Sequence, residues 1–169
     1  MKIKFNLQKR DGTFFSETDP EADLQKYKEE IRDKSVLSCS LSISVSGADW
    51  IIHDELGPLI NNFCFQVPLD LLRTSAAEYH FFEVFGKVDL QRIDESVLIS
   101  GAFVQDIKVP FLKFIFEALH CGFRCIDFLE QFDNKSLNND RLLLMESASR
   151  VKAYLLQQHP EFLDSKADN

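Results

Sequence analysis

The sequence predicts an α+β fold, with an antiparallel sheet of four to six strands, a buried helix packed on one face, and flanking N- and C-terminal helices. Residues 2–8 and 37–46 alternate apolar and polar side chains, as strands with one buried face do. Residues 110–132 and 138–160 instead repeat their apolar side chains at helical spacing. Because 169 residues suit one domain, we expect a single globular domain over 1–169, with its last few residues disordered.

The N-terminal segment is expected to form a hairpin followed by a surface helix. Residues 2–8 make the first strand, and the Asp-Gly pair at 11–12 predicts a turn into a return strand at 13–15. Typical helix-start residues follow at 18–20. We therefore expect a helix within 18–34, and its narrow apolar stripe predicts a position at the surface.

The clearest strand is residues 37–46, in which five apolar side chains alternate with five serines. One face should belong to the core, and the serine face should meet water or a partner. For residues 47–59 we expect a turn and then a short helix or loop, broken by Gly57 and Pro58. Residues 63–67 then predict a brief strand, and residues 68–76 predict a helical turn or two.

Two long strands are expected at 79–90 and 96–109, joined by a hairpin loop at 91–96. Gly101 is a candidate bulge position in the second strand. Pro110 should end the sheet and begin the buried helix. The apolar residues of the second strand that share one parity are Val97, Ile99, Phe103, Ile107 and Val109.

The sequence HCGFRC at 120–125 raises the question of a metal or redox site. At helical spacing, Cys121 and Cys125 fall on the apolar surface of the predicted helix, whereas His120 falls in its polar stripe. A structural zinc site needs three or four converging ligands, so we predict no metal site here. An alternative is that Gly122 closes a helix ending at Cys121, and residues 123–129 would then be a strand, so the choice between helix and strand for 123–129 stays open.

Composition limits the classes of partner. Nineteen basic and 27 acidic residues give a net charge of −8, which disfavours direct binding to nucleic acid and favours a basic protein partner. Sixteen phenylalanines predict an aromatic core. No stretch approaches the ~18 apolar residues of a membrane span, and the opening residues lack a secretory signal. We therefore expect a cytoplasmic protein, no membrane partner, and four cysteines that are reduced thiols.

No sequence motif for catalysis or cofactor binding is present. The glycines do not form a phosphate-binding loop, and the serine-elbow and zinc-protease motifs are absent. We expect a non-enzymatic protein without a cofactor.

The more specific hypothesis for the segment around the only tryptophan is that it binds a partner protein. A Trp anchor surrounded by carboxylates suits the grip on a basic partner. The alternative is that the tryptophan fills the end of the core while the acids face water. The candidate partner-binding residues are Asp49, Trp50, His53, Asp54 and Glu55.

A small, acidic, single-domain chain without a catalytic motif is similar to the immunity proteins of bacterial toxin systems, including contact-dependent inhibition. The resemblance is one of type over the whole chain and transfers no individual residue. It implies a non-enzymatic inhibitor that binds a cognate toxin domain, often a basic nuclease, and occludes its active site. Two alternatives remain from other classes: a small-ligand-binding or enzymatic α+β domain, and a subunit of a larger complex.

Overall fold

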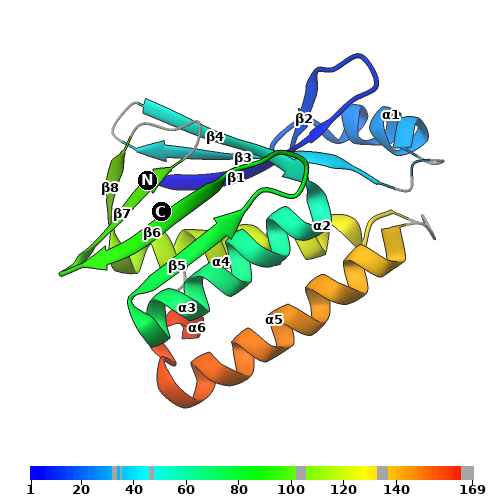
Figure 1. The fold of residues 1–169 in the computed structure, drawn as a ribbon. Coiled ribbons are helices and arrows are strands. Elements are labelled where there is room, and N and C mark those ends of the chain that lie inside the picture. Colours follow the sequence, from blue (N-terminus) through cyan, green and yellow to red (C-terminus); the bar gives the residue numbers. More distant parts are fainter. Residues whose placement is uncertain (32–33, 35, 46–47, 102–105, 133–136, 165–169) are drawn as a thin grey trace.

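The computed structural model describes residues 1–31, 34, 36–45, 48–101, 106–132 and 137–164, and it confirms the α+β class (Figure 1). The described strands form two antiparallel sheets of four rather than one sheet. The first sheet has the order β2-β1-β3-β4, and the second has the order β5-β6-β7-β8. The bounds in the first sheet are β1 Lys2–Gln8, β2 Phe14–Ser16, β3 Ser38–Val45 and β4 Ala48–Glu55. Those in the second are β5 Ala76–His80, β6 Lys87–Ile93, β7 Ser96–Gly101 and β8 Ile107–Pro110.

The N-terminal predictions are confirmed. β1 alternates buried and exposed side chains, and its hairpin return is β2. The helix α1 (Glu21–Ile31) lies at the edge of the molecule and buries a stripe that includes Tyr27. Tyr27 stacks on Phe15 of β2, with ring centroids 5.1 Å apart. The stacked pair therefore fixes α1 against the first sheet.

The prediction for residues 47–67 is wrong in two places. Residues 48–55 form the strand β4, and the predicted strand 63–67 lies instead within a continuous helix. That helix comprises α2 (Leu56–Leu59), the π-helix η1 (Ile60–Gln66) and α3 (Val67–Thr74). A short apolar run has the same appearance in a buried strand and in a helix packed on several sides, which explains the second error.

The two predicted long strands are also corrected, because each is divided. The first is interrupted by a loop at 81–86, which separates β5 from β6. The second is divided into β7 and β8, and Phe103 lies outside the described residues. Gly101 ends β7 with a φ of 134°, a backbone angle that favours glycine, so it marks a strand end rather than a bulge.

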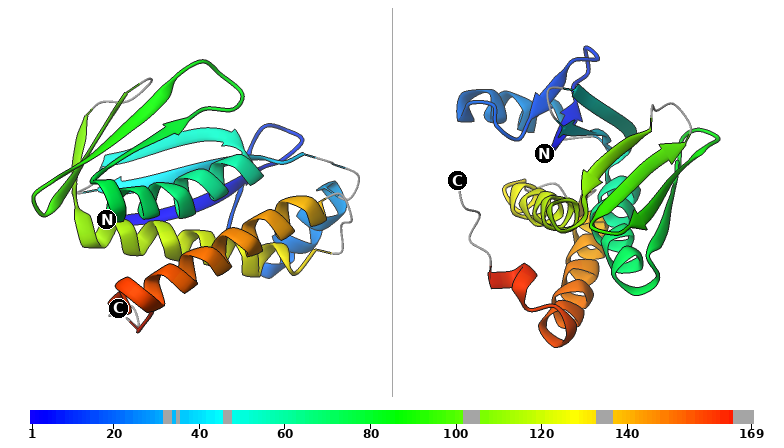
Figure 2. Two further views of the ribbon diagram at one scale, coloured as in Figure 1. Left: turned by 60° about the horizontal axis from the view of Figure 1, so that its bottom comes forward. Right: turned by 90° about the vertical axis from the view of Figure 1, so that its left-hand side faces the viewer.

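The remaining helices are α4 (Phe111–Leu129), α5 (Asn138–Gln158) and α6 (Glu161–Asp164), which confirms the predicted buried and C-terminal helices. The molecule has three layers (Figure 2). The two sheets lie on one side, α4 and the α2–η1–α3 helix lie beneath them, and α5 packs beneath those helices. α4 contacts both sheets and η1, so one core serves the whole domain.

The polar stripe of α4 covers the edge of β1 that β2 leaves open. Glu117 accepts a hydrogen bond from the Ile3 N–H at 3.3 Å, and Arg124 donates one to the Ile3 carbonyl at 2.8 Å. Arg124 also makes a bidentate ion pair with Glu17, with Nε 2.7 Å from Oε2 and Nη2 3.0 Å from Oε1. The stripe thus satisfies strand-edge groups that would otherwise be open to pairing with another chain.

Gly122 sets how closely α4 approaches η1. A Cβ at this position would lie 2.6 Å from the ring of Phe65 and 3.1 Å from the Cβ of Cys64. Helix propensity alone would make Gly122→Ala stabilising by about 1 kcal/mol. We expect the clash to dominate and the variant to lose about 1–3 kcal/mol in the free energy of unfolding, measured by urea denaturation. A gain in stability would contradict this close contact.

Candidate partner-binding surface

The structure divides the five predicted partner-binding residues between the two faces of β4. Asp49 and His53 are exposed on the outer face of the first sheet. Trp50 and Asp54 point the other way and are only 8% and 1% exposed, and Glu55 is partly exposed at the strand end. The expected tryptophan anchor surrounded by carboxylates is therefore not formed, because strand alternation separates neighbours that a loop would have kept together.

Trp50 is part of the core. Its ring packs near Phe63 of η1, with centroids 6.3 Å apart, and its indole N–H has no hydrogen-bond partner among the described residues. This placement matches the alternative in which the tryptophan fills the end of the core. It does not match the other half of that alternative, since Asp54 does not face water.

Asp54 accepts four hydrogen bonds, and three of them link β4 to β5 and the loop that follows it. Its Oδ2 accepts from the Tyr79 hydroxyl and from the Phe82 N–H at 2.7 Å. Its Oδ1 accepts from the N–H groups of Glu83 at 3.1 Å and Glu55 at 2.9 Å. A buried carboxylate is stabilised only when such donors surround it. One side chain of β4 therefore fixes the end of β5 and the start of the following loop.

Tyr79 holds its hydroxyl in the protonated, donating form. Burial, followed by the hydrogen bond to Asp54, raises the pKa of Tyr79 well above its ordinary value. Its ring also packs edge-on against Phe63 and Phe81, with centroids 5.8 and 5.4 Å away. The donor that Asp54 requires is thus fixed in position by the core.

The segment that Asp54 fixes is residues 81–86, which we call the β5–β6 loop. The Phe81 N–H donates to the Gly86 carbonyl at 3.2 Å and closes the loop. Gly86 has a φ of 147°, which favours glycine at this turn. Hydrogen bonds therefore hold the backbone of the loop at its base and at Phe82 and Glu83.

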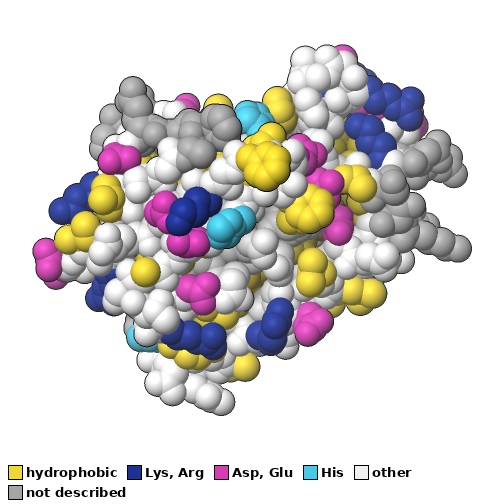
Figure 3. All heavy atoms as spheres, viewed as in Figure 1, with side chains coloured by type: hydrophobic (Ala, Val, Ile, Leu, Met, Phe, Trp, Pro, Cys, Tyr) yellow, Lys and Arg dark blue, Asp and Glu magenta, His cyan; other side chains and the backbone are white. Residues whose placement is uncertain are grey.

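Apolar side chains at the tip of this loop face solvent. Phe85 is fully exposed at 103%, Phe82 is 67% exposed, and Val84 is about half exposed. Figure 3 shows hydrophobic side chains beside acidic ones over this end of the β5–β6 hairpin. Burial of such aromatic rings by a partner would remove a large apolar area from water, so the arrangement is suited to binding.

Carboxylates lie beside the apolar tip. Glu83 is an exposed loop residue, and Glu55 is partly exposed at the end of β4. Burial, followed by the negative charges of Glu83, Asp54 and Asp140, raises the pKa of Glu55. The loop and its neighbours thus combine aromatic surface with concentrated negative charge, which is complementary to a basic surface.

The raised pKa of Glu55 predicts how Glu55→Gln changes the pH dependence of stability. The folded state holds a proton on Glu55 more tightly than the unfolded state does, so stability is lost as the pH rises from the ordinary pKa of 4.5 through the raised folded value. Glu55→Gln should therefore stabilise the protein near neutral pH and have less effect at about pH 4, as measured by urea denaturation. Equal effects at both pH values would contradict this assignment.

The serine face of β3 is polar, and one of its serines, Ser40, is only 3% exposed. Asn6 donates to Ser40 at 3.3 Å and to Ser42 at 3.1 Å, and Ser44 donates to Asp49 at 2.6 Å. These hydrogen bonds run between neighbouring strands, so the face is largely occupied by its own contacts. Its hydroxyls offer a partner less apolar surface than the β5–β6 loop does.

The HCGFRC segment lies inside α4, as the helical interpretation predicts. Cys121 and Cys125 are fully buried, and residues 123–129 are helical, so Gly122 does not end the helix. His120 is partly exposed and stacks on Phe116, with ring centroids 4.0 Å apart. Among the described residues, no group of three or more His, Cys, Asp or Glu side chains has an arrangement that could hold a metal ion.

The cysteines should be chemically inert in the folded protein. All four are free and buried, and burial raises the pKa of the Cys39, Cys121 and Cys125 thiols. Because the thiolate is the reactive form, we expect no rapid reaction with a disulfide reagent under native conditions and four reactive thiols in denaturant. Rapid native labelling of any one of them would contradict the described packing.

Comparison with known protein families, curated proteins and solved structures found no match to this chain. Within the described parts of the chain, no helix is long and apolar enough to cross a membrane. Function therefore has to be argued from the geometry above. The sequence analysis did not identify Phe82 and Phe85 as candidate residues. Three phenylalanines lie next to Gly86 without the alternation of a strand, and this pattern indicates an apolar loop.

Proposed function

We propose that this protein is a non-enzymatic immunity protein that binds a basic bacterial toxin domain through the β5–β6 loop and its acidic neighbours. The observation that carries the proposal is the pair of exposed aromatic rings on a loop fixed by a buried carboxylate. The inhibitor would act in the cytoplasm and would contact the toxin rather than nucleic acid.

The fixed loop supports tight binding for an entropic reason. Exposed apolar loops usually lose conformational freedom when a partner orders them, and that loss weakens affinity. Here Asp54 and the Phe81–Gly86 hydrogen bond already order the backbone. More of the free energy from burying Phe82 and Phe85 would then appear as affinity.

Charge supports a basic partner. The chain carries a net charge of −8, and Glu55 and Glu83 place part of it beside the apolar tip. Complementary charge speeds association and disfavours the wrong partners. A toxin whose active site binds a phosphate backbone would present the matching positive surface, so occupying that surface would block its substrate.

A second exposed apolar group is weaker as an interface. Leu142, Leu143 and Met145 of α5 are each about half exposed, and all three are aliphatic. Aromatic residues are enriched at the centres of interfaces, and both loop phenylalanines are more exposed than these three residues. The β5–β6 loop is therefore the preferred docking surface.

The test of this function is co-expression of the chain with basic toxin domains taken from its native host. We expect host cells to survive only when the intact chain is present. The purified proteins should form a stable complex whose association slows as salt rises, because charge steers the encounter. Equal killing with and without the chain, and no complex between the purified proteins, would reject the proposal.

A further inference from the structure

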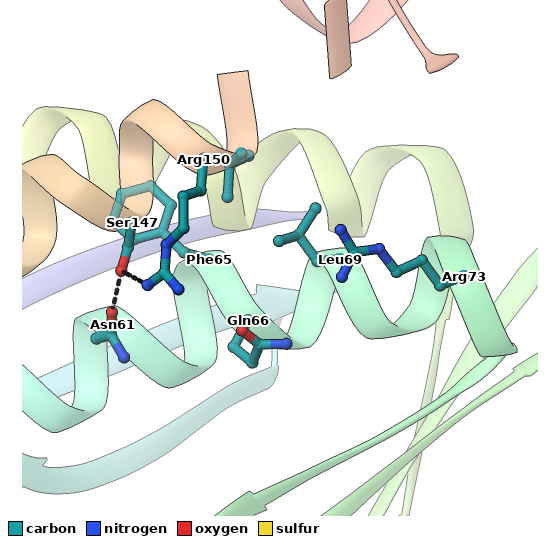
Figure 4. A pocket seen from close by; sticks show the side chains of 8 residues that line it. Asn61, Phe65, Gln66, Leu69, Arg73, Ser147 and Arg150 are labelled. Atoms are coloured by element: carbon teal, nitrogen blue, oxygen red, sulfur yellow. Dashed lines mark hydrogen bonds between the residues drawn. The ribbon is translucent and has the colours of Figure 1, made fainter. Parts of the chain in front are cut away.

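A separate hollow lies between the α2–η1–α3 helix and α5, away from the β5–β6 loop (Figure 4). Its volume is about 100 Å³, enough for a small ion or one functional group of a larger molecule. Both polar and apolar side chains line it, and two of them are arginines. The lining residues with polar side chains are Asn61, Gln66, Arg73, Ser147 and Arg150.

One arginine is held in place by a short polar chain. Arg150 donates from Nη2 to the Ser147 hydroxyl at 3.0 Å, and Ser147 donates in turn to the Asn61 Oδ1 at 2.6 Å. Ser147 is only 4% exposed, so its position is fixed by packing. Asn61 belongs to η1, and π-helical turns often occur at functional sites. The guanidinium of Arg150 is thus oriented at the end of the hollow that Asn61 and Ser147 form (Figure 4).

The second arginine is oriented by an aromatic ring. The guanidinium of Arg73 lies over the ring of Tyr154, with its carbon 4.6 Å from the ring centroid. This cation–π contact holds the guanidinium next to α5. Figure 4 shows Arg73 reaching back from α3 toward the residues that line the hollow.

Neither arginine is neutralised within the described structure. No described carboxylate forms an ion pair with Arg73 or Arg150, although the chain has 27 acidic residues. Asp70 is the acid linked to the hollow, because it accepts a hydrogen bond from Gln66 at 2.8 Å. Both arginines are exposed where they line the hollow, and a guanidinium edge without a carboxylate partner can donate to phosphate or carboxylate oxygens.

We infer that this hollow is a binding site for an oxyanion, either a phosphoryl or a carboxylate group of a small molecule. Arg150 supplies the fixed donor, and Arg73 supplies a second cation from the opposite helix. This inference does not depend on the proposed toxin binding, since the residues belong to different elements and have no contact with the β5–β6 loop in the interactions described.

The test is an NMR titration of ¹⁵N-labelled protein with inorganic phosphate and, separately, with malonate. Sodium chloride at equal ionic strength is the reference. We expect saturable shifts at Ser147 and Arg150 beyond those caused by chloride. Phosphate alone would identify a phosphoryl site, malonate alone would identify a carboxylate site, and similar binding of both would identify a general oxyanion site.

Variants connect those shifts to the hollow. Arg150→Gln should weaken binding by about tenfold or more, because it removes a charge-assisted donor. Asp70→Asn should strengthen binding by removing a nearby negative charge. Arg92→Gln is the control for loss of one positive charge, since Arg92 is exposed like Arg150 but lies over Phe111, elsewhere in the protein. The inference is overturned if neither anion gives saturable shifts, or if Arg150→Gln, folded by its melting curve, binds as tightly as the parent.

Discussion

Replacing Phe82 and Phe85 together by serine is expected to weaken the complex with the toxin domain by about 100-fold or more. Interface residues that anchor a complex each contribute about 2 kcal/mol or more when truncated, and both rings are exposed in the free protein. For the same reason the free energy of unfolding should change by no more than about 0.5 kcal/mol. Calorimetric titration gives the affinity, and urea denaturation gives the stability.

The matched control for this variant is a double substitution at other exposed apolar residues. The exposed fraction of Leu156 in α5 is 66%, nearly the same as that of Phe82, and the exposed fraction of Leu112 in α4 is 63%. Leu112→Ser with Leu156→Ser removes exposed apolar surface away from the loop, although less than the phenylalanine variant removes, so it should leave the affinity unchanged. If both double variants weakened the complex equally, the effect would reflect general hydrophobicity rather than docking of the β5–β6 loop.

Asp54→Ala is expected to lower the free energy of unfolding by about 3–5 kcal/mol. It removes the acceptor for the buried Tyr79 hydroxyl and for three backbone N–H groups, and each unsatisfied buried donor costs about 1–3 kcal/mol. The loop N–H groups can recover part of that loss by bonding water, so the total stays below the sum. Urea denaturation of both proteins measures the difference.

Tyr79→Phe tests the contribution of the Tyr79 hydroxyl separately from that of the backbone N–H groups bound to Asp54. It removes one donor and leaves Asp54 its three backbone partners, so we expect a loss of about 1 kcal/mol. In the double variant the tyrosine hydroxyl is no longer stranded, so the combined loss should be smaller than the sum of the single losses. Strict additivity would show that the hydroxyl and the carboxylate do not act together.

Where a segment has a single buried face, the sequence predicted its structure well. Ile3, Phe5 and Leu7 alternate along β1, and the polar stripe of α4 runs through His120 and Arg124 as the spacing indicated. In both elements the side chains facing the core are apolar, and apart from Leu112 of α4 the exposed ones are polar. Local periodicity therefore contained enough information to predict them.

Prediction failed where the pattern of apolar and polar residues does not correspond to one buried apolar face. In β4 the buried face includes the carboxylate of Asp54, which is acceptable only because Tyr79 and the β5–β6 loop supply donors from another sheet. In η1 the consecutive apolar residues 63–65 are all buried, so no periodicity was visible. Both cases depend on tertiary contacts, and one sequence does not reveal them.

The candidate surface was located only in part. The acidic residues Asp54 and Glu55 are indeed at one place in the fold, but the exposed aromatic residues beside them come from the β5–β6 loop and not from Trp50. The packing of the two sheets sets the contact between Asp54 of β4 and the β5–β6 loop, which lies about 30 residues later in the chain. Sequence proximity favoured the tryptophan, which strand alternation places in the core.

The most direct test of the account is hydrogen–deuterium exchange of this protein, free and in complex with the toxin domain. If the β5–β6 loop is the docking surface, peptides covering residues 82–86 and the end of β4 at Glu55 should gain protection in the complex. Peptides covering Leu142 to Met145 of α5 should exchange at the same rate in both states. Protection confined to α5, with the loop unchanged, would contradict the central claim.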